Sequence, residues 1–134
     1  MKWMLLFIWM NLSCATLTKS EASMPQCLID PVIVSPQMYR VIRETPKVRE
    51  IRLYARAGQS DRAHGHYRGR WTVLQGGKGR LYDAAGAFRD VELKAGMSGE
   101  QARTILHRFE NRGDTPIEVQ MIETKSDEIQ WCPR

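Results

Sequence analysis

Apolar and polar residues alternate along several short stretches of the chain, a pattern typical of strands that bury one face. In residues 49–58, one face would carry Ile51, Leu53, Ala55 and Ala57, while arginines and a tyrosine occupy the other. Successive side chains of a strand point to opposite faces of its sheet. The pattern therefore predicts a half-buried strand over this segment.

Glycine-rich segments separate the alternating stretches. We expect tight turns at 76–79 (GGKG), 84–87 (AAGA) and 112–116 (RGDTP). Residues 23–35 contain two prolines and a short apolar run, and we interpret them as an entry arm. Turns at about eight- to ten-residue spacing are typical of a β-sandwich or a β-barrel.

The last alternating stretch would direct Ile117, Val119 and Met121 toward the interior. A chain of 134 residues with an apolar share of 43% fits one globular domain with a small core. The fold class expected from these patterns is all-β. Besides residues 49–58, strands are expected at 38–44, 71–74, 80–83, 88–96, 102–111 and 117–124.

The N-terminus differs from the rest of the chain. Lys2 precedes the apolar run WMLLFIWMNL, and small residues follow it, so residues 1–22 resemble a secretory signal peptide. The run is shorter than the roughly 20 residues of a membrane span. Cleavage after Ala15 or Ala22 would leave one domain, 23–134 in the second case, with no stable membrane span. The protein would then be periplasmic or secreted. A lipoprotein anchored through Cys14 and an uncleaved anchor or buried helix are the alternatives.

Cysteine usage bears on the same question. Cleavage after Ala22 would leave Cys27 and Cys132, near the two ends of the mature chain. Disulfides persist in oxidising compartments outside the cytoplasm. We predict that these two cysteines pair, and the alternative is two free thiols in frayed ends.

The charge balance argues against nucleic acid as a partner. The formal net charge of +5 is mild, and no lysine-rich run or aromatic RNA-binding motif accompanies it.

Three histidines carry the candidate chemistry. His64 and His66 are two residues apart, so both side chains leave the same face if the segment is extended. His107 would come from another strand. Neutral imidazoles suit iron, copper, nickel or zinc. A pair of histidines on one strand also occurs as a surface or packing feature, and that alternative stays open.

The histidine motifs resemble those of the cupin superfamily. The first cupin motif begins with Gly, five residues and His-x-His, as in Gly58 and the HGH of 64–66. The second motif is matched at Gly96, His107 and Asn111. The resemblance spans most of the chain after the N-terminal segment. It implies a double-stranded β-helix, or jelly roll, with a metal inside the barrel, and often a homodimer formed through edge strands.

Two departures from the cupin pattern affect this expectation. The glutamate of the first motif is absent, since Gly69 or Arg70 occupies its place, and 100–106 stands where the second motif has a Pro-x-Gly turn. Three imidazoles alone can still hold a metal and leave positions open for substrate or water. Without the glutamate the metal keeps one more positive charge, which favours anionic ligands.

Residues near the first motif are candidates for ligand binding. Arg70 could bind a carboxylate or phosphate by bidentate hydrogen bonds. Tyr67 and Trp71 would line the pocket, although Trp71 also fits a core position. Ser60 and Ser98 have no free histidine as a base, so no catalytic residue is assigned.

Two functions remain open from the sequence. One is an exported three-histidine metalloenzyme of dioxygenase or isomerase/lyase type, holding Fe, Zn, Mn, Ni or Cu and acting on a small anionic molecule. The other is a non-catalytic barrel that binds or senses a small ligand or a metal.

Overall fold

The computed structural model of the chain describes residues 27–126 and 128–133. The signal peptide expected at 1–22, with Cys14, lies outside the described residues and stays a prediction. Within the described ranges, no helix combines the length and apolar character that a membrane span requires.

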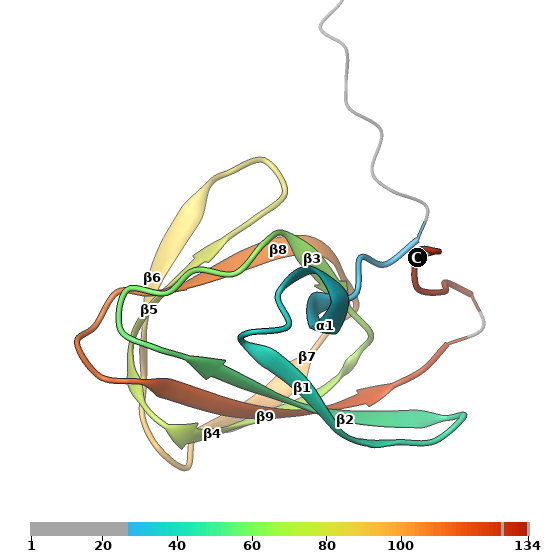
Figure 1. The fold of residues 1–134 in the computed structure, drawn as a ribbon, viewed down its shortest axis with the longest axis horizontal. Coiled ribbons are helices and arrows are strands. Elements are labelled where there is room, and N and C mark those ends of the chain that lie inside the picture. The colour runs from blue at the N-terminus through green and yellow to red at the C-terminus, as the bar shows by residue number, and fades with distance from the viewer. Residues whose placement is uncertain (1–26, 127, 134) are drawn as a thin grey trace, which may run out of the picture.

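The described chain is almost entirely β-structure, with a single short helix (Figure 1). Proline at the first helical position and the Asp30 side chain, which accepts from the Val32 N–H, begin that helix. It lies in the segment expected to be an irregular entry arm. The elements are α1 (Pro31–Val34), β1 (Tyr39–Glu44), β2 (Val48–Ala55), β3 (His64–His66), β4 (Gly69–Gln75), β5 (Gly77–Tyr82), β6 (Phe88–Leu93), β7 (Ser98–Gln101), β8 (Thr104–Asn111) and β9 (Ile117–Thr124).

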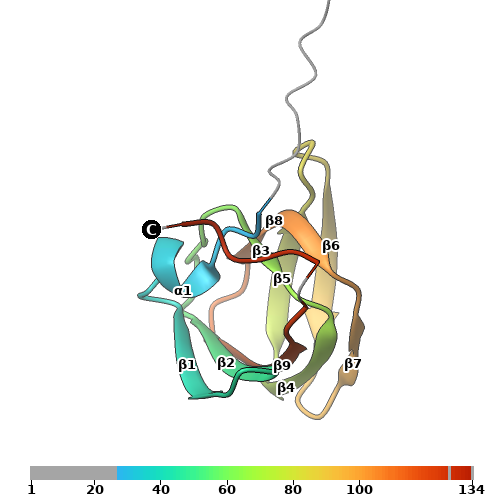
Figure 2. The ribbon, with the colours of Figure 1, turned by 90° about the vertical axis from the view of Figure 1, so that its right-hand side faces the viewer.

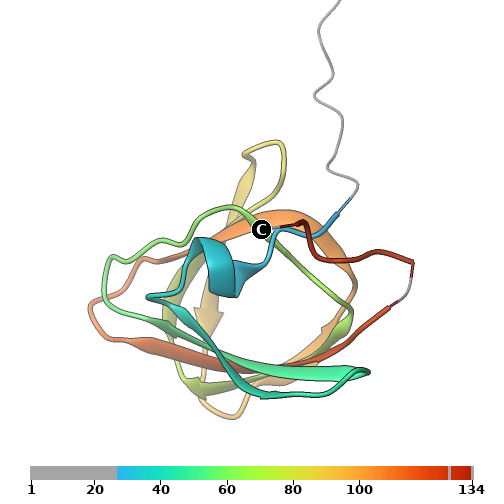
Figure 3. The same cartoon turned by 45° about the vertical axis from the view of Figure 1, so that its right-hand side comes forward.

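Two antiparallel sheets face each other across one interior. The first sheet has the strand order β1-β2-β9-β4-β7, and the second has the order β3-β8-β5-β6. Figures 2 and 3 show the strands curving around a common centre, with α1 beside β1 and β3. The all-β jelly-roll fold expected from the sequence is confirmed.

Alternation along β2 and β9 builds one wall of the core. Ile51, Leu53 and Ala55 of β2 are buried, and so are the inward residues predicted for β9. Burying one such aliphatic side chain contributes about 1.5–3 kcal/mol. Ala57 is a correction to the prediction, because it is exposed beyond the end of β2.

The segment GGKG is not the tight turn that the sequence suggested. Gly77 already begins β5, and the chain passes at Gly76 from the five-stranded sheet to the four-stranded sheet. The glycines permit close packing instead. A Cβ on Gly79 would lie 2.5 Å from the Phe109 ring, and one on Gly76 would lie 2.2 Å from the Leu93 carbonyl oxygen. The turn expected at 84–87 is present, with Gly86 at φ +85.

The two ends of the described chain are joined. Cys27 and Cys132 form a disulfide with a Cα–Cα distance of 4.9 Å, which confirms the predicted pairing. Leu28 lies beside this bond, accepts from the Cys132 N–H at 2.7 Å and is fully buried. The next residue, Ile29, accepts from the Gly65 N–H at 2.8 Å. The joined termini therefore lie directly against the strand that carries two of the histidines.

Candidate metal site

Strand β3 places His64 and His66 in the interior of the barrel. The segment is extended, and both side chains are almost completely buried. In the neighbouring strand β8, His107 pairs with His64 and Thr104 pairs with His66. The three histidines that the sequence singled out therefore come from two adjacent strands of one sheet.

The three imidazoles converge on one point. The Nε2 atom of His64 lies 2.9 Å from Nε2 of His66 and 3.0 Å from Nε2 of His107. One nitrogen from each of the three histidines lies within 4.8 Å of the others. Nitrogens bound tetrahedrally to one zinc ion, each about 2.0–2.1 Å from it, are themselves roughly 3.4 Å apart. The two distances at His64 are a few tenths of an ångström shorter than this, so an ion would need these nitrogens to move slightly apart.

Burial keeps two of these imidazoles neutral. Desolvation, followed by the nearby His66, lowers the pKa of His64 to about 2. The same two causes lower the pKa of His107 to about 3. Protonated imidazole cannot bind a metal, so a depressed pKa keeps the nitrogens in the ligating form at neutral pH.

The outer nitrogens of the β3 histidines have hydrogen-bond acceptors. Nδ1 of His64 lies 2.8 Å from the Arg62 carbonyl oxygen, and Nδ1 of His66 lies 2.5 Å from Oε1 of Glu123. A carbonyl oxygen or a carboxylate accepts a hydrogen bond, so each Nδ1 carries an N–H. With both rings neutral, each Nε2 presents a lone pair toward the other, only 2.9 Å away. Two lone pairs at this distance repel each other, and a cation between them removes the repulsion.

Glu123 is a site residue that the sequence analysis missed. It is fully buried on β9, and its Oε2 atom has no hydrogen-bond partner among the described residues. The sequence pattern could have predicted its inward position, because Glu123 continues the alternation of Ile117, Val119 and Met121. A carboxylate that accepts from the outer nitrogen of a metal-ligating histidine fixes its tautomer and orientation.

Tyr39 and Asp61 form a second buried group beside the histidines. The Tyr39 hydroxyl donates to Oδ2 of Asp61 at 2.7 Å and lies 3.3 Å from Nε2 of His64. Oδ1 of Asp61 accepts from the Phe109 N–H at 2.7 Å. Burial raises the pKa of Asp61 to about 6, against the effect of these hydrogen bonds. Neither Tyr39 nor Asp61 was singled out from the sequence.

Of the three residues expected to bind a ligand, Trp71 lines the interior cavity, whereas Arg70 and Tyr67 do not. Trp71 is half-buried and lines the interior cavity. Arg70, its neighbour on β4, is exposed on the opposite face of the strand and does not line that cavity. Tyr67 is buried against Trp131, with ring centroids 4.9 Å apart. Roles for Arg70 and Tyr67 in ligand binding stay predictions, which these positions do not favour.

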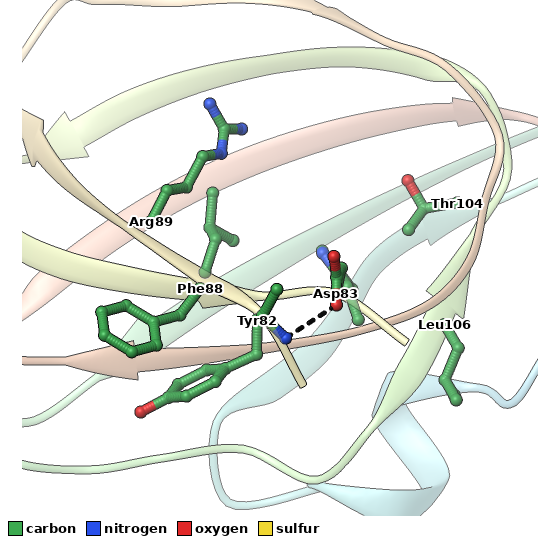
Figure 4. Close-up of a pocket in the computed structure, with 9 residues that line it drawn as sticks. Tyr82, Asp83, Phe88, Arg89, Thr104 and Leu106 are labelled. Carbon is green, nitrogen blue, oxygen red and sulfur yellow. Dashed lines mark hydrogen bonds between the residues drawn. The ribbon is translucent and has the colours of Figure 1, made fainter. Parts of the chain in front are cut away.

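A cavity of about 640 Å³ opens beside the histidines. His66 and His107 line it together with Trp71, and most of its other walls are apolar. A second cavity of about 390 Å³ adjoins it and is shown in Figure 4. The two cavities share the side chains of Leu81, Arg89, Thr104 and His107.

Solved structures show what this arrangement is similar to. A cupin domain from Bordetella pertussis Tohama I matches 66% of this chain and 93% of its own, at 20% identity and a TM-score of 0.61. A protein with a double-stranded β-helix domain from Klebsiella pneumoniae matches 68% of this chain and 78% of its own, at 20% identity and a TM-score of 0.55. The protein has a cupin fold. A cupin superfamily protein from Desulfitobacterium hafniense matches 66% of this chain and 77% of its own, at 11% identity and a TM-score of 0.52. No family model and no curated protein matches the sequence.

The histidine cluster fits a metal-binding cupin. Three imidazole nitrogens lie close together inside the barrel, and His66 and His107 line the cavity. Such a set suits a divalent transition metal and leaves coordination positions open. Glu123 is a buried carboxylate in direct hydrogen-bond contact with the cluster. It contacts Nδ1 of His66, on the side of the ring away from the other two histidines.

Proposed function

We propose that this protein is an exported metal-binding cupin in which His64, His66 and His107 hold a divalent metal that binds, or acts on, a small anionic molecule. The observation that carries the proposal is the opposed pair of Nε2 atoms on β3. Both outer nitrogens face acceptors, so the two Nε2 atoms point toward each other at 2.9 Å, and a divalent cation between them would bind both.

Iron, zinc, manganese, nickel or copper would supply Lewis-acid chemistry or dioxygen activation at this position. The chain's own residues orient the ligands. Glu123 and the Arg62 carbonyl hold the two β3 imidazoles in the tautomer that exposes Nε2. The mostly apolar cavity walls offer few hydrogen-bond partners to water, and charge interactions are stronger beside such walls than in bulk solvent.

Electrostatics supports an anionic ligand. Imidazoles bind a metal in their neutral form, so a divalent ion held by three of them would keep its charge at the open positions. Glu123 offsets part of that charge from behind His66, and the exposed cationic residue Arg89 is among those that line both cavities.

A non-catalytic barrel that binds or senses a ligand is the second candidate. The cavity supports it, because general acid–base groups are sparse on its walls. Glu92 and Glu100 border the cavity but are exposed. Glu110 of β8 does not line the cavity, and it accepts from the Tyr82 hydroxyl at 2.6 Å and from Arg112 at 3.0 Å.

Export is supported by two features of the chain. The N-terminal pattern resembles a signal peptide, and the disulfide between Cys27 and Cys132 suits an oxidising compartment. The expected homodimer remains a proposal from the family resemblance.

The first experiment measures metal content by elemental mass spectrometry on protein purified without a histidine tag. We expect near-stoichiometric divalent metal in the parent and its loss in His64→Ala, with the fold of the variant checked by circular dichroism. Parent protein that is metal-free and fails to take up added divalent ions would contradict the proposal. Oxygen consumption with thiols, diketones and flavonols then separates an oxygenase from a binding barrel.

A further inference from the structure

The shape and lining of the larger cavity restrict the kind of molecule it accepts. Its volume of about 640 Å³ is in the range of small-molecule sites. Its walls are largely aliphatic and aromatic, so a ligand gains most by burying apolar surface there. The apolar side chains include Leu53, Trp71, Val73, Leu93, Val119 and Met121.

Arg89 brings a positive charge to this apolar space. Alternation along β6 directs Arg89, Val91 and Leu93 to the cavity, whereas Phe88 is exposed on the opposite face. Figure 4 shows the Arg89 and Phe88 side chains leaving the strand in different directions. Arg89 pairs with Leu81 of β5, which in turn pairs with Phe109 of β8. Arg89 therefore belongs to the same inner face as His107, with β5 between their two strands, and its side chain is exposed.

The guanidinium of Arg89 makes no hydrogen bond or ion pair within residues 27–126 and 128–133. Neighbouring arginines differ in this respect. Arg80 forms an ion pair with Asp90, and Arg108 stacks over the Tyr82 ring and donates to Ser60. The N–H groups of the Arg89 guanidinium are thus available for a bidentate contact with a carboxylate.

Two acidic residues also border the cavity, and neither neutralises Arg89. Glu92 falls on the outer face of β6 by alternation and is exposed. Glu100 is exposed on β7, where it pairs with Arg70 of the outer face of β4. Among the charged side chains that line the cavity in the described part of the chain, Arg89 is therefore the one that alternation places on the inner face, although it is exposed like Glu92 and Glu100.

We infer that the ligand is an apolar carboxylate, whose hydrocarbon or aryl body fills the larger cavity and whose carboxylate lies at the shared wall between Arg89 and His107. The inference rests on the proposed function, because the carboxylate would also lie near the metal held by the histidines. It names Arg89, and not Arg70, as the residue that selects the anion.

The test compares acids with matched neutral amides by isothermal titration calorimetry on zinc-loaded protein. The probes are 3-phenylpropanoate, octanoate and their primary amides. We expect each acid to bind at least about tenfold more tightly than its amide, as one charge-assisted contact implies. Arg89→Gln should abolish most of this preference, while Arg70→Gln, on the outer face, should leave it unchanged.

Metal content is measured on every sample, so the two proposals fail separately. Loss of metal binding in the parent would contradict the proposed function. Equal affinity for acids and amides, no binding of any probe, or an unchanged preference in metal-loaded Arg89→Gln would overturn the inference about the ligand. If Arg70→Gln, and not Arg89→Gln, removed the preference for acids over amides, the anion contact would lie on the outer face of β4. This result would also overturn the inference.

Discussion

Nδ1 of His66 lies 2.5 Å from Oε1 of Glu123, although 57 residues separate them along the chain. The contact joins β3 of one sheet to β9 of the other across the barrel interior. It ties the orientation of one candidate ligand to a buried carboxylate, so the geometry of the site depends on the packing of the two sheets.

We predict that Glu123→Gln weakens metal binding about 10- to 100-fold, in line with the loss of such outer hydrogen-bond partners elsewhere. The amide keeps nearly the same shape but removes the negative charge that favours the His66 Nδ1–H. Competition with a chelator, followed by elemental analysis, measures the change in dissociation constant.

Glu118→Gln is the matched control for this experiment. Glu118 also lies on β9, but it faces outward and pairs with Arg52 at 3.3 Å. Metal affinity should be unchanged in this variant. Equal affinities in Glu123→Gln and the parent would show that the buried carboxylate does not support the site.

Gly65→Ala is expected to destabilise the protein by about 1–3 kcal/mol, the usual cost of overpacking a well-packed interior. An added Cβ would lie 2.7 Å from the Ile105 carbonyl oxygen and 2.9 Å from that of Thr104. Backbone atoms cannot move aside as a flexible side chain would, so β3 would be pushed away from β8. Urea unfolding monitored by fluorescence measures the change in the free energy of unfolding.

Gly113→Ala serves as the control for that variant. The nearest atom to an added Cβ there lies at 3.4 Å, so we expect a change within about 0.5 kcal/mol. Equal stability of Gly65→Ala and the parent would mean that the strand with the two histidines packs less tightly than described.

Sequence alternation was sufficient to predict the strands that bury one face. Ile51 and Leu53 on β2, and Ile117 to Met121 on β9, are buried as expected because a strand has a fixed period of two. The GGKG prediction was wrong because glycine occurs both where a chain turns and where another group approaches closely. Sequence alone does not separate these two uses.

The site was predictable only in part. The three histidines were predictable, because the chain has no others and all three fall at ligand positions of the cupin motifs. Glu123 did not, because its significance depends on a partner from the opposite sheet. Arg70 was chosen for its position in the cupin motif, yet an inward Trp71 already implies that its neighbour faces outward.

Removal of the disulfide should lower stability by about 2–5 kcal/mol, since Cys27 and Cys132 close a loop across 105 residues. Thermal unfolding with and without a reducing agent measures the effect, and Cys27→Ser/Cys132→Ser should match the reduced parent. A reduced protein as stable as the oxidised one would indicate that the two ends contribute little to the fold.

Asn111→Ala should destabilise the protein by about 2–4 kcal/mol. Its Nδ2 donates to the carbonyl oxygens of Ala55 at 2.9 Å and Thr115 at 2.8 Å, and its Oδ1 accepts from the Gly113 N–H at 2.9 Å. Each lost hydrogen bond costs about 1 kcal/mol, and leaving buried partners unpaired adds to that. Asn111→Asp is the informative comparison in denaturant unfolding, because it keeps the acceptor and removes both donors. Stability equal to the parent in both variants would contradict this account.

The joined termini have a consequence for assembly. β3 stands at one edge of its sheet, and the backbone of Leu28 and Ile29 covers that edge, held in turn by the Cys132 N–H. A covered edge has no free row of backbone groups with which another chain can pair. We therefore expect that a homodimer built by joining edge strands would use β1, β6 or β7, and would leave the strand that carries His64 and His66 inside one barrel.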